Sequence, residues 1–276
     1  CELIVVGDFD EKGDLVVNML ESESQEVSEE IITGAVEFAK PFLKQIIDFQ
    51  KQITEKYGRV KEIIISPVSS PDLERDAKGF LKDKIEAVLF QKDKPTREKE
   101  ETQLRNELVE FVKLKYPAED AAKFLNRLFD EELDQALVSS VLKNGQRPDG
   151  RKADELRPLS AEVGLLPRTH GSGLFCRGTT KALSIQTLGA PGDQQIMEGM
   201  EISGKKRFMH HYNFPPYSVG ETKPMRGPGR REIGHGMLAE RAILSLIPDT
   251  ETFPYTIRVV SEIVSSNGST SMASVC

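Results

Sequence analysis

Two adjacent arginines and a histidine stand within one short segment, Gly229-Arg-Arg-Glu-Ile-Gly-His-Gly236. Guanidinium groups are planar and permanently charged forks that fit phosphate oxygens, so Arg230 and Arg231 are candidate phosphate ligands. A helix is expected to begin here, and His235 can add a hydrogen-bond donor near its N-terminus. Two structural alternatives stay open: Arg230 pairs with Glu232 on the surface, or His235 is a structural histidine.

A loop rich in hydroxyl groups follows an alternating strand near the end of the sequence. The strand is Tyr255-Thr-Ile-Arg-Val-Val-Ser-Glu-Ile-Val264, and the loop is Ser265-Ser-Asn-Gly-Ser-Thr-Ser-Met-Ala-Ser274. Small residues that open a helix can direct backbone N–H groups and hydroxyls at one tetrahedral anion, which predicts a site for inorganic phosphate. The pattern is neither a Walker loop nor a Rossmann fingerprint, which disfavours nucleotide-hydrolysing motors and dehydrogenases. An ordinary serine-rich surface loop is the alternative.

A third segment, His210-His-Tyr-Asn-Phe-Pro-Pro-Tyr-Ser-Val-Gly-Glu221, combines aromatic residues with prolines between basic clusters. Tyr212, Phe214 and Tyr217 could stack on unpaired bases, while the prolines restrict the chain. The alternative is that these rings belong to the core or to a subunit interface.

Positive charge gathers around these segments. The chain of 276 residues carries a net charge of -7, yet residues 147–276 hold 16 Lys and Arg against 13 Asp and Glu. The first 146 residues hold 21 against 31. Between Lys205 and Arg231 there are seven basic residues and one acidic residue, Glu221. A polyanion is therefore expected to bind this part of the chain.

Other classes of protein lose support from composition. No apolar run approaches the roughly 20 residues of a membrane span, and no leader pattern is present, so a cytoplasmic protein without membrane contact is expected. The cysteines, Cys1, Cys176 and Cys276, are odd in number and lack CxxC or Cys/His spacing. Neither a zinc site nor a disulfide framework is expected.

The elements that must position these residues change along the chain. The apolar runs at 2–6 and 15–20 predict a β-hairpin, and residues 7–13 predict a plain turn rather than a calcium loop. Ser28, followed by Glu29 and Glu30, predicts a helix start with the hydroxyl as its cap. A kink or break is expected at Pro41. An apolar stripe along this helix is expected to pack in a core: Ile31, Ala35, Phe38, Phe42, Ile46, Phe49 and Ile53.

The remaining sequence predicts a linker with one short extended segment at 58–71 and a charged helical bundle at 72–143. The apolar sets of this bundle are Leu104, Leu108, Phe111 and Val112, with Phe124, Leu125, Leu128 and Phe129. From Asn144 the composition becomes rich in strands and turns. We expect a strand at 183–188, two runs around a Ser203-Gly204 turn, a helix at 236–247 and a strand at 256–264. This mixed order predicts the α+β class.

Four motifs in the same order resemble those of the bacterial polynucleotide phosphorylase family. They are Leu166–Thr180, His211–Thr222, Arg230–Gly236, and Val259–Ile263 with Ser266–Cys276; Met19–Ser22 and Gly34–Phe38 add to the resemblance. The resemblance covers essentially the whole chain and implies two ribonuclease PH-like cores, both partial, joined by an all-α linker. Residues 1–57 would be the C-terminal part of the first core, 58–71 a linker, 72–143 the helical domain, and 144–276 the N-terminal half of the second core. The chain would then be an internal fragment.

The resemblance also implies an activity: 3′-to-5′ phosphorolysis of single-stranded RNA, reversible and releasing nucleoside diphosphates, in messenger RNA turnover. Ser269, Thr270 and Ser271 would hold the attacking inorganic phosphate, with Thr270 standing where the family often has serine. Arg230, Arg231 and His235 would be catalytic residues that engage phosphate and the RNA backbone. The family is expected to form homotrimers and to join RNA-degradation complexes.

The resemblance implies Mg²⁺ as the metal, with its carboxylate ligands beyond Cys276, so this chain alone is not expected to turn over. Two alternatives stay open. One is a catalytically silent RNA-binding or scaffold subunit of a ribonuclease PH-like ring. The other is an unrelated phosphate-binding domain that acts on small metabolites.

Overall fold

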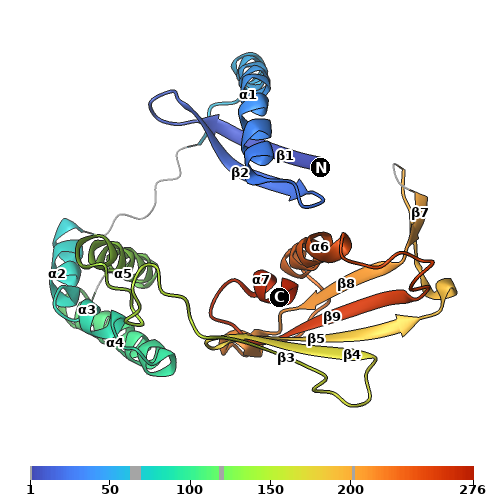
Figure 1. Cartoon of the computed structure of the whole chain (residues 1–276). Helices are drawn as coiled ribbons and strands as arrows, with labels where there is room; N and C mark the ends of the chain where they lie inside the picture. Colours follow the sequence, from blue (N-terminus) through green and yellow to red (C-terminus); the bar gives the residue numbers. More distant parts are fainter. Residues whose placement is uncertain (1, 63–69, 118–120, 201–202) are drawn as a thin grey trace. The chain divides into compact units, whose positions relative to one another are not determined.

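The computed structural model describes residues 2–62, 70–117, 121–200 and 203–276 (Figure 1). The chain divides into two compact units, residues 1–59 with 157–276, and residues 60–156. Helices occur together with sheets whose strands are mostly antiparallel, which confirms the α+β class. No helix in the described part of the chain is long and apolar enough to span a membrane.

The predicted hairpin is present as β1 (Glu2–Phe9) and β2 (Leu15–Glu23), which pair antiparallel. Its turn depends on Asp10, whose Oδ1 accepts the backbone N–H of Lys12 at 2.9 Å and of Asp14 at 2.8 Å. Gly13 takes a positive φ of 85° at the end of this turn. The plain turn is confirmed, because the Asp10 carboxylate satisfies backbone groups of its own loop.

Helix α1 (Glu29–Tyr57) follows the hairpin. Ser28 occupies the predicted N-cap position, but its side chain forms no capping bond. The hydroxyl instead bonds the carboxylate of Glu30, which lowers the pKa of Glu30 below its ordinary value. Of the two expected outcomes at Pro41, a kink or a break, the break is wrong, because the helix continues through Pro41. A proline removes one backbone bond, and the rest of a long helix can outweigh that loss.

The predicted core role of the α1 stripe is wrong for the described residues. Ile47 is buried in a helix that contacts β1, whereas Phe38 is 72% exposed. Most of the stripe shares this exposure, namely Ile31, Phe42, Ile46, Phe49 and Ile53. Periodicity identified an apolar face correctly, but α1 has two adjoining apolar faces, and the two-stranded hairpin covers only one.

The helical unit contains α2 (Pro71–Leu81), α3 (Ile85–Leu89), α4 (Lys94–Lys115) and α5 (Ala122–Asn144). Ser70 and Asp93 cap α2 and α4, since Oγ of Ser70 accepts from Leu73 N–H and Oδ2 of Asp93 accepts from Thr96 N–H. Its core confirms both predicted apolar sets, with Phe111 and Phe124 at the edge: Leu73, Ala77, Leu81, Leu104, Leu108, Val112, Ala121, Leu125, Leu128 and Phe129. The extended segment expected in the linker falls mainly on 63–69, outside the described residues.

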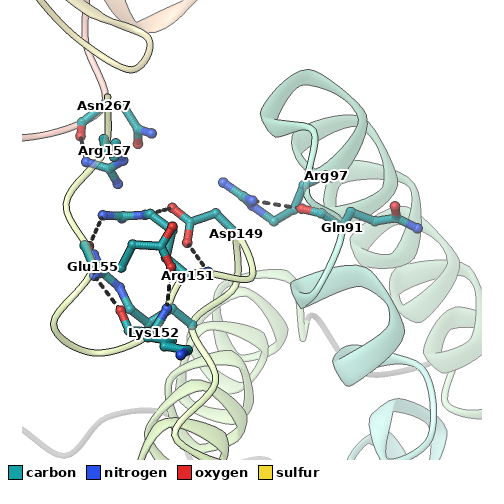
Figure 2. Close-up of polar contacts among 9 residues, drawn as sticks. Gln91, Arg97, Asp149, Arg151, Lys152, Glu155, Arg157 and Asn267 are labelled. Carbon is teal, nitrogen blue, oxygen red and sulfur yellow. Dashed lines mark hydrogen bonds and ion pairs between the residues drawn. The ribbon is translucent and has the colours of Figure 1, made fainter. Parts of the chain in front are cut away.

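The segment after α5 is ordered by its own ion pair. Gly145 ends α5 with a φ of +62°. Beyond it, Arg151 Nε donates to Oδ2 of Asp149 at 2.8 Å, and its Nη1 donates to the carbonyl of Glu155 at 3.0 Å (Figure 2). Residues up to 156 group with the helical unit, whereas the sequence suggested a change of domain at 144.

A five-stranded sheet forms the centre of residues 157–276, in the order β3-β4-β5-β9-β8. All neighbours are antiparallel except β8 and β9, which are parallel. The strands are β3 (Leu159–Val163), β4 (Gly171–Arg177), β5 (Thr180–Gly189), β8 (Phe208–Asn213) and β9 (Thr256–Ser265). The strands predicted at 183–188 and 256–264 are therefore confirmed.

A separate hairpin joins β6 (Gln195–Glu198) to β7 (Ser203–Lys206). The turn expected at Ser203-Gly204 was placed too late, because Ser203 already pairs with Glu198 and Gly204 with Met197. A glycine is compatible with a strand as well as a turn, so composition did not locate the turn. Short 3₁₀ segments lie at Pro191–Asp193 and Pro216–Val219.

Helices α6 (Arg230–Leu244) and α7 (Thr270–Val275) lie on one face of this sheet (Figure 1). Helix α6 packs on β8, with Gly236 buried at the contact. It begins at Arg230 rather than at the expected Gly236 and ends before Ile247. The sequence does not mark the start of α6, because the capping group is not a side chain before the helix. It is the carboxylate of Glu232 within the first turn, which accepts from Gly229 N–H at 3.0 Å.

Candidate phosphate-binding site

The first turn of α6 carries the two arginines on an exposed surface. Gly229 precedes the helix, and Arg230 and Arg231 are its first residues. The surface pair considered above is not formed, because Glu232 caps Gly229, and no ion pair between Arg230 and Glu232 occurs among the residues the structure describes. The Arg230 guanidinium is therefore available to an anion near the positive end of the helix dipole.

Arg231 is oriented by an aromatic ring. Its guanidinium carbon lies 4.9 Å from the centre of the Phe214 ring. Phe214 in turn stacks nearly parallel to Tyr212, with ring centres 6.3 Å apart. A cation over a ring face is attracted by the ring quadrupole and loses freedom, so this contact limits the directions that Arg231 can take.

Tyr212 connects the two helices that carry the predicted phosphate ligands. It lies on β8, is 3% exposed, and belongs to a small core with Ala182, Ile263 and Ala273. Its ring meets the ring of His235 on α6 edge-on, with centres 5.0 Å apart. Its hydroxyl lies 2.6 Å from Oγ1 of Thr270 at the start of α7. Burial raises the pKa of Tyr212, so the hydroxyl keeps its proton for hydrogen bonding.

The aromatic segment therefore divides between two roles. Tyr212 and the partly buried Phe214 pack in the core, as the structural alternative held. Tyr217 is 57% exposed. It is the aromatic residue of the three that could still stack on an unpaired base.

His235 is half-buried on α6, and its Nδ1 is enclosed without a partner among the described residues. Burial lowers the pKa of His235, and the positive charge of Arg231 acts in the same direction. The imidazole is therefore neutral near pH 7 and can bond a ligand without carrying a charge of its own.

The three predicted phosphate ligands of the loop before α7 differ in accessibility. Ser269 is exposed and adopts a left-handed backbone conformation with a φ of 48°, directly after Gly268 at 82°. Ser271 is partly exposed. Thr270 is 5% exposed, and its hydroxyl is already bonded to Tyr212. Ser269 and Ser271 can therefore offer free hydroxyls, whereas the Thr270 side chain fixes the start of the helix.

Residues that the sequence did not single out support this loop. Arg177 Nη2 donates to the carbonyl of Gly268 at 2.6 Å, and Oγ1 of Thr180 accepts from Asn267 N–H at 2.9 Å. Both lie inside the motif Leu166–Thr180, but nothing in their spacing indicates a contact with residues far along the chain. A search for arginines at the base of tight hairpin turns would have marked Arg177.

His210 is a further histidine outside the predicted site, and it is 4% exposed. Its Nε2 lies 3.0 Å from Oγ of Ser261, which lies 2.7 Å from Oγ of Ser184. Burial lowers the pKa of His210, which favours the neutral ring. These bonds tie β8 to β9 and β5 and indicate a structural role.

The sequence of this chain is similar to those of known proteins. Residues 155–276 match the 3′ exoribonuclease family, domain 1. The chain is 46% identical over 275 residues to the polyribonucleotide nucleotidyltransferase of Oceanobacillus iheyensis, covering 100% of this chain and 38% of that protein. It is 47% identical over 274 residues to the one from Heliobacterium modesticaldum, covering 99% and 38%. The chain thus spans 38% of the length of these curated relatives.

Among solved structures, the Archaeoglobus fulgidus exosome with RNA bound to the active site matches 53% of this chain and 57% of its own. The TM-score of 0.40 and the identity of 18% make this a likeness that carries no functional argument. The sequence relationships carry the assignment. The chain is similar over essentially its whole length to part of the polyribonucleotide nucleotidyltransferases, and its residues 155–276 match domain 1 of the 3′ exoribonuclease family.

Proposed function

We propose that this chain contributes the phosphate-holding part of an enzyme that degrades single-stranded RNA from its 3′ end by phosphorolysis. The observation that carries the proposal is the contact of Tyr212 with His235 in the second turn of α6 and with Thr270, the first residue of α7. Arg230, Arg231 and His235 on α6 would engage phosphate and the RNA backbone. Ser269 and Ser271 would bind the attacking phosphate, with Thr270 positioned between them.

The proposed reaction needs positioning more than covalent help. An oxygen of inorganic phosphate attacks the terminal phosphodiester, a new P–O bond forms, and the bond to the 3′ oxygen of the preceding nucleotide breaks. That 3′ oxygen takes up the proton that the attacking hydrogen phosphate gives up, and a nucleoside diphosphate leaves. Several oxygens carry charge at once, and the adjacent guanidiniums with the hydroxyls of the loop suit that distribution.

The proposal extends to assembly. Residues 1–57 and 144–276 would belong to two ribonuclease PH-like cores, with the helical residues 72–143 between them, in a ring of three cytoplasmic subunits. No cluster of three or more His, Cys, Asp or Glu suited to a metal ion occurs within the described residues. No step of the proposal passes through the expected Mg²⁺.

Binding measurements on the 276-residue chain test the proposal. We expect Arg230→Ala with Arg231→Ala to weaken binding of a single-stranded oligonucleotide and to lower the slope of log affinity against log salt by about 1.4, at about 0.7 per phosphate contact. Ser269→Ala with Ser271→Ala should weaken binding of inorganic phosphate roughly tenfold and RNA binding much less.

The matched control is Arg75→Ala with Arg127→Ala, which removes two exposed arginines of the helical unit. This control should leave both affinities unchanged. Unaltered RNA binding in the α6 double variant would support a phosphate site for small metabolites instead. Equal loss in the control would indicate non-specific attraction and would contradict the proposed site.

A further inference from the structure

The loop before α7 is held by the turn that joins β4 to β5. Arg177 and Thr180 are paired at the base of this turn, and Gly178 within it takes a φ of +57°. Arg177 Nη2 donates to the Gly268 carbonyl at 2.6 Å. The fully buried Thr180 accepts from Asn267 N–H at 2.9 Å. The peptide groups on either side of the 267–268 peptide are thus both bonded to one turn.

These bonds determine where the loop directs its donors. In a trans peptide the carbonyl and the N–H point in opposite directions, and the chain contains no cis peptide within the described residues. The Gly268 carbonyl accepts from Arg177 Nη2 and, at the longer distance of 3.4 Å, from Thr180 Oγ1, so the N–H of Ser269 points away from both side chains. The backbone N–H at the head of the proposed phosphate loop is therefore oriented by Arg177.

The backbone conformation of Ser269 is unfavourable unless neighbouring contacts stabilise it. Ser269 carries a side chain yet has a φ of 48°, in the left-handed region that residues with a Cβ seldom occupy. Neighbouring contacts must therefore maintain it. A second arginine contributes, since Arg157 Nη1 donates to the Asn267 carbonyl at 3.3 Å (Figure 2).

We propose that Arg177 is a positioning residue of the phosphate site: through the Gly268 carbonyl it sets the conformation of Ser269 so that the loop is ready for inorganic phosphate. This inference rests on the proposed function and adds a residue outside both predicted segments. Arg177 acts through the loop and need not touch phosphate or RNA. A lysine can make the same single bond to a carbonyl, whereas a methionine cannot.

The test compares Arg177→Met with Arg177→Lys in the 276-residue chain. Binding of inorganic phosphate is measured by calorimetry, and the amide resonance of Ser269 is followed by NMR. We expect Arg177→Met to weaken phosphate binding about tenfold and to shift the Ser269 amide, while Arg177→Lys stays within about threefold of the original chain. Binding of a single-stranded oligonucleotide should change less than twofold in both variants.

The control is Lys181→Met, which removes an exposed cation one residue beyond the turn. It should change neither the phosphate affinity nor the Ser269 amide. A loss in Lys181→Met equal to that in Arg177→Met would mean that charge rather than position matters and would overturn the inference. Should Arg177→Met unfold, Arg177→Gln takes its place: its shorter, uncharged side chain should also weaken phosphate binding and shift the Ser269 amide, and an unchanged affinity with an unshifted amide would overturn the inference.

The two proposals fail in different ways. If Ser269→Ala with Ser271→Ala weakens phosphate binding while Arg177→Met does not, the positioning role is wrong and the proposed function stands. If the original chain binds no phosphate, or the serine variant binds it unchanged, the phosphate site itself is wrong.

Discussion

The hydroxyl of Tyr212 lies 2.6 Å from Oγ1 of Thr270, and both side chains are buried. The bond joins strand β8 to the first residue of α7 and leaves neither hydroxyl to water. A buried hydroxyl that loses its partner retains the cost of its lost hydration. Tyr212 therefore contributes to the stability of the fold as well as to the position of the loop.

Tyr212→Phe should lower the free energy of unfolding by about 1 kcal/mol, because it removes one hydrogen bond and keeps the ring. Urea unfolding followed by circular dichroism measures this change. Tyr217→Phe is the control, since Tyr217 is exposed and should have no effect. Equal stability of the two variants would show that the bond to Thr270 contributes nothing.

Gly236 and Gly234 should respond to alanine with opposite signs. A Cβ on Gly236 would lie 3.0 Å from the carbonyl oxygen of His210, whereas a Cβ on Gly234 would meet nothing within 4 Å. Gly236→Ala should cost about 1 to 3 kcal/mol by forcing α6 away from β8. Gly234→Ala should stabilise the helix by up to about 1 kcal/mol. Thermal unfolding of both variants checks this, and stabilisation by Gly236→Ala would contradict the observed packing.

Protonation of His235 should strengthen RNA binding at acid pH. Burial and Arg231 lower the pKa of His235 below its ordinary 6.5, so the ring gains its charge only as pH falls beneath that value. A bound phosphodiester would favour the charged form, so affinity for an oligouridylate should rise by roughly fivefold, about 1 kcal/mol, as pH decreases at fixed ionic strength.

His235→Gln should remove that rise while leaving the binding near pH 8 within about twofold. The other histidines are the same in both proteins, so the difference between the two pH profiles isolates His235. Identical profiles would mean that His235 lies away from the RNA. Without RNA, the free energy of unfolding depends on pH in the opposite direction. The lowered pKa of His235 stabilises the fold above pH 6.5, and this contribution is lost as pH falls below that value.

Asp76 should govern the acid stability of the helical unit. Its hydrogen bonds with Lys115 and then Tyr116 lower the pKa of Asp76 from 3.8 to about 2. A lowered carboxyl pKa stabilises the fold above the unfolded value, and that contribution is lost as pH falls from 3.8 towards about 2. Asp76→Asn should therefore flatten the fall in stability across this window.

Urea unfolding monitored by helical circular dichroism at several acid pH values measures the flattening. Asp72→Asn is the control, because its ion pair with Arg75 is exposed to solvent and should contribute little. A fall in stability as steep in Asp76→Asn as in the original chain would contradict the role of these hydrogen bonds.

Local elements followed from local patterns. The alternation at 2–20 predicted a hairpin, and the apolar sets of α4 and α5 predicted a helical core. These predictions succeeded because the backbone hydrogen bonds of a hairpin and of a helix join residues that are close along the chain. Boundaries were less determined. Helix α6 begins at Arg230 because Glu232 caps it from within, where no Ser, Thr, Asp or Asn marks the start.

The sequence by itself contained the residue types, the charge distribution and the family resemblance. These features indicated Arg230, Arg231, His235 and the serine-rich loop as the candidate site. Only the tertiary structure decided which of these groups are accessible. Thr270 turns inward to Tyr212, 58 residues earlier, and Arg177 reaches Gly268, 91 residues later. Such contacts depend on the strand order β3-β4-β5-β9-β8, which brings together segments that are far apart in the sequence. Contacts of this kind produce no periodic pattern of residues, so the sequence alone does not reveal them.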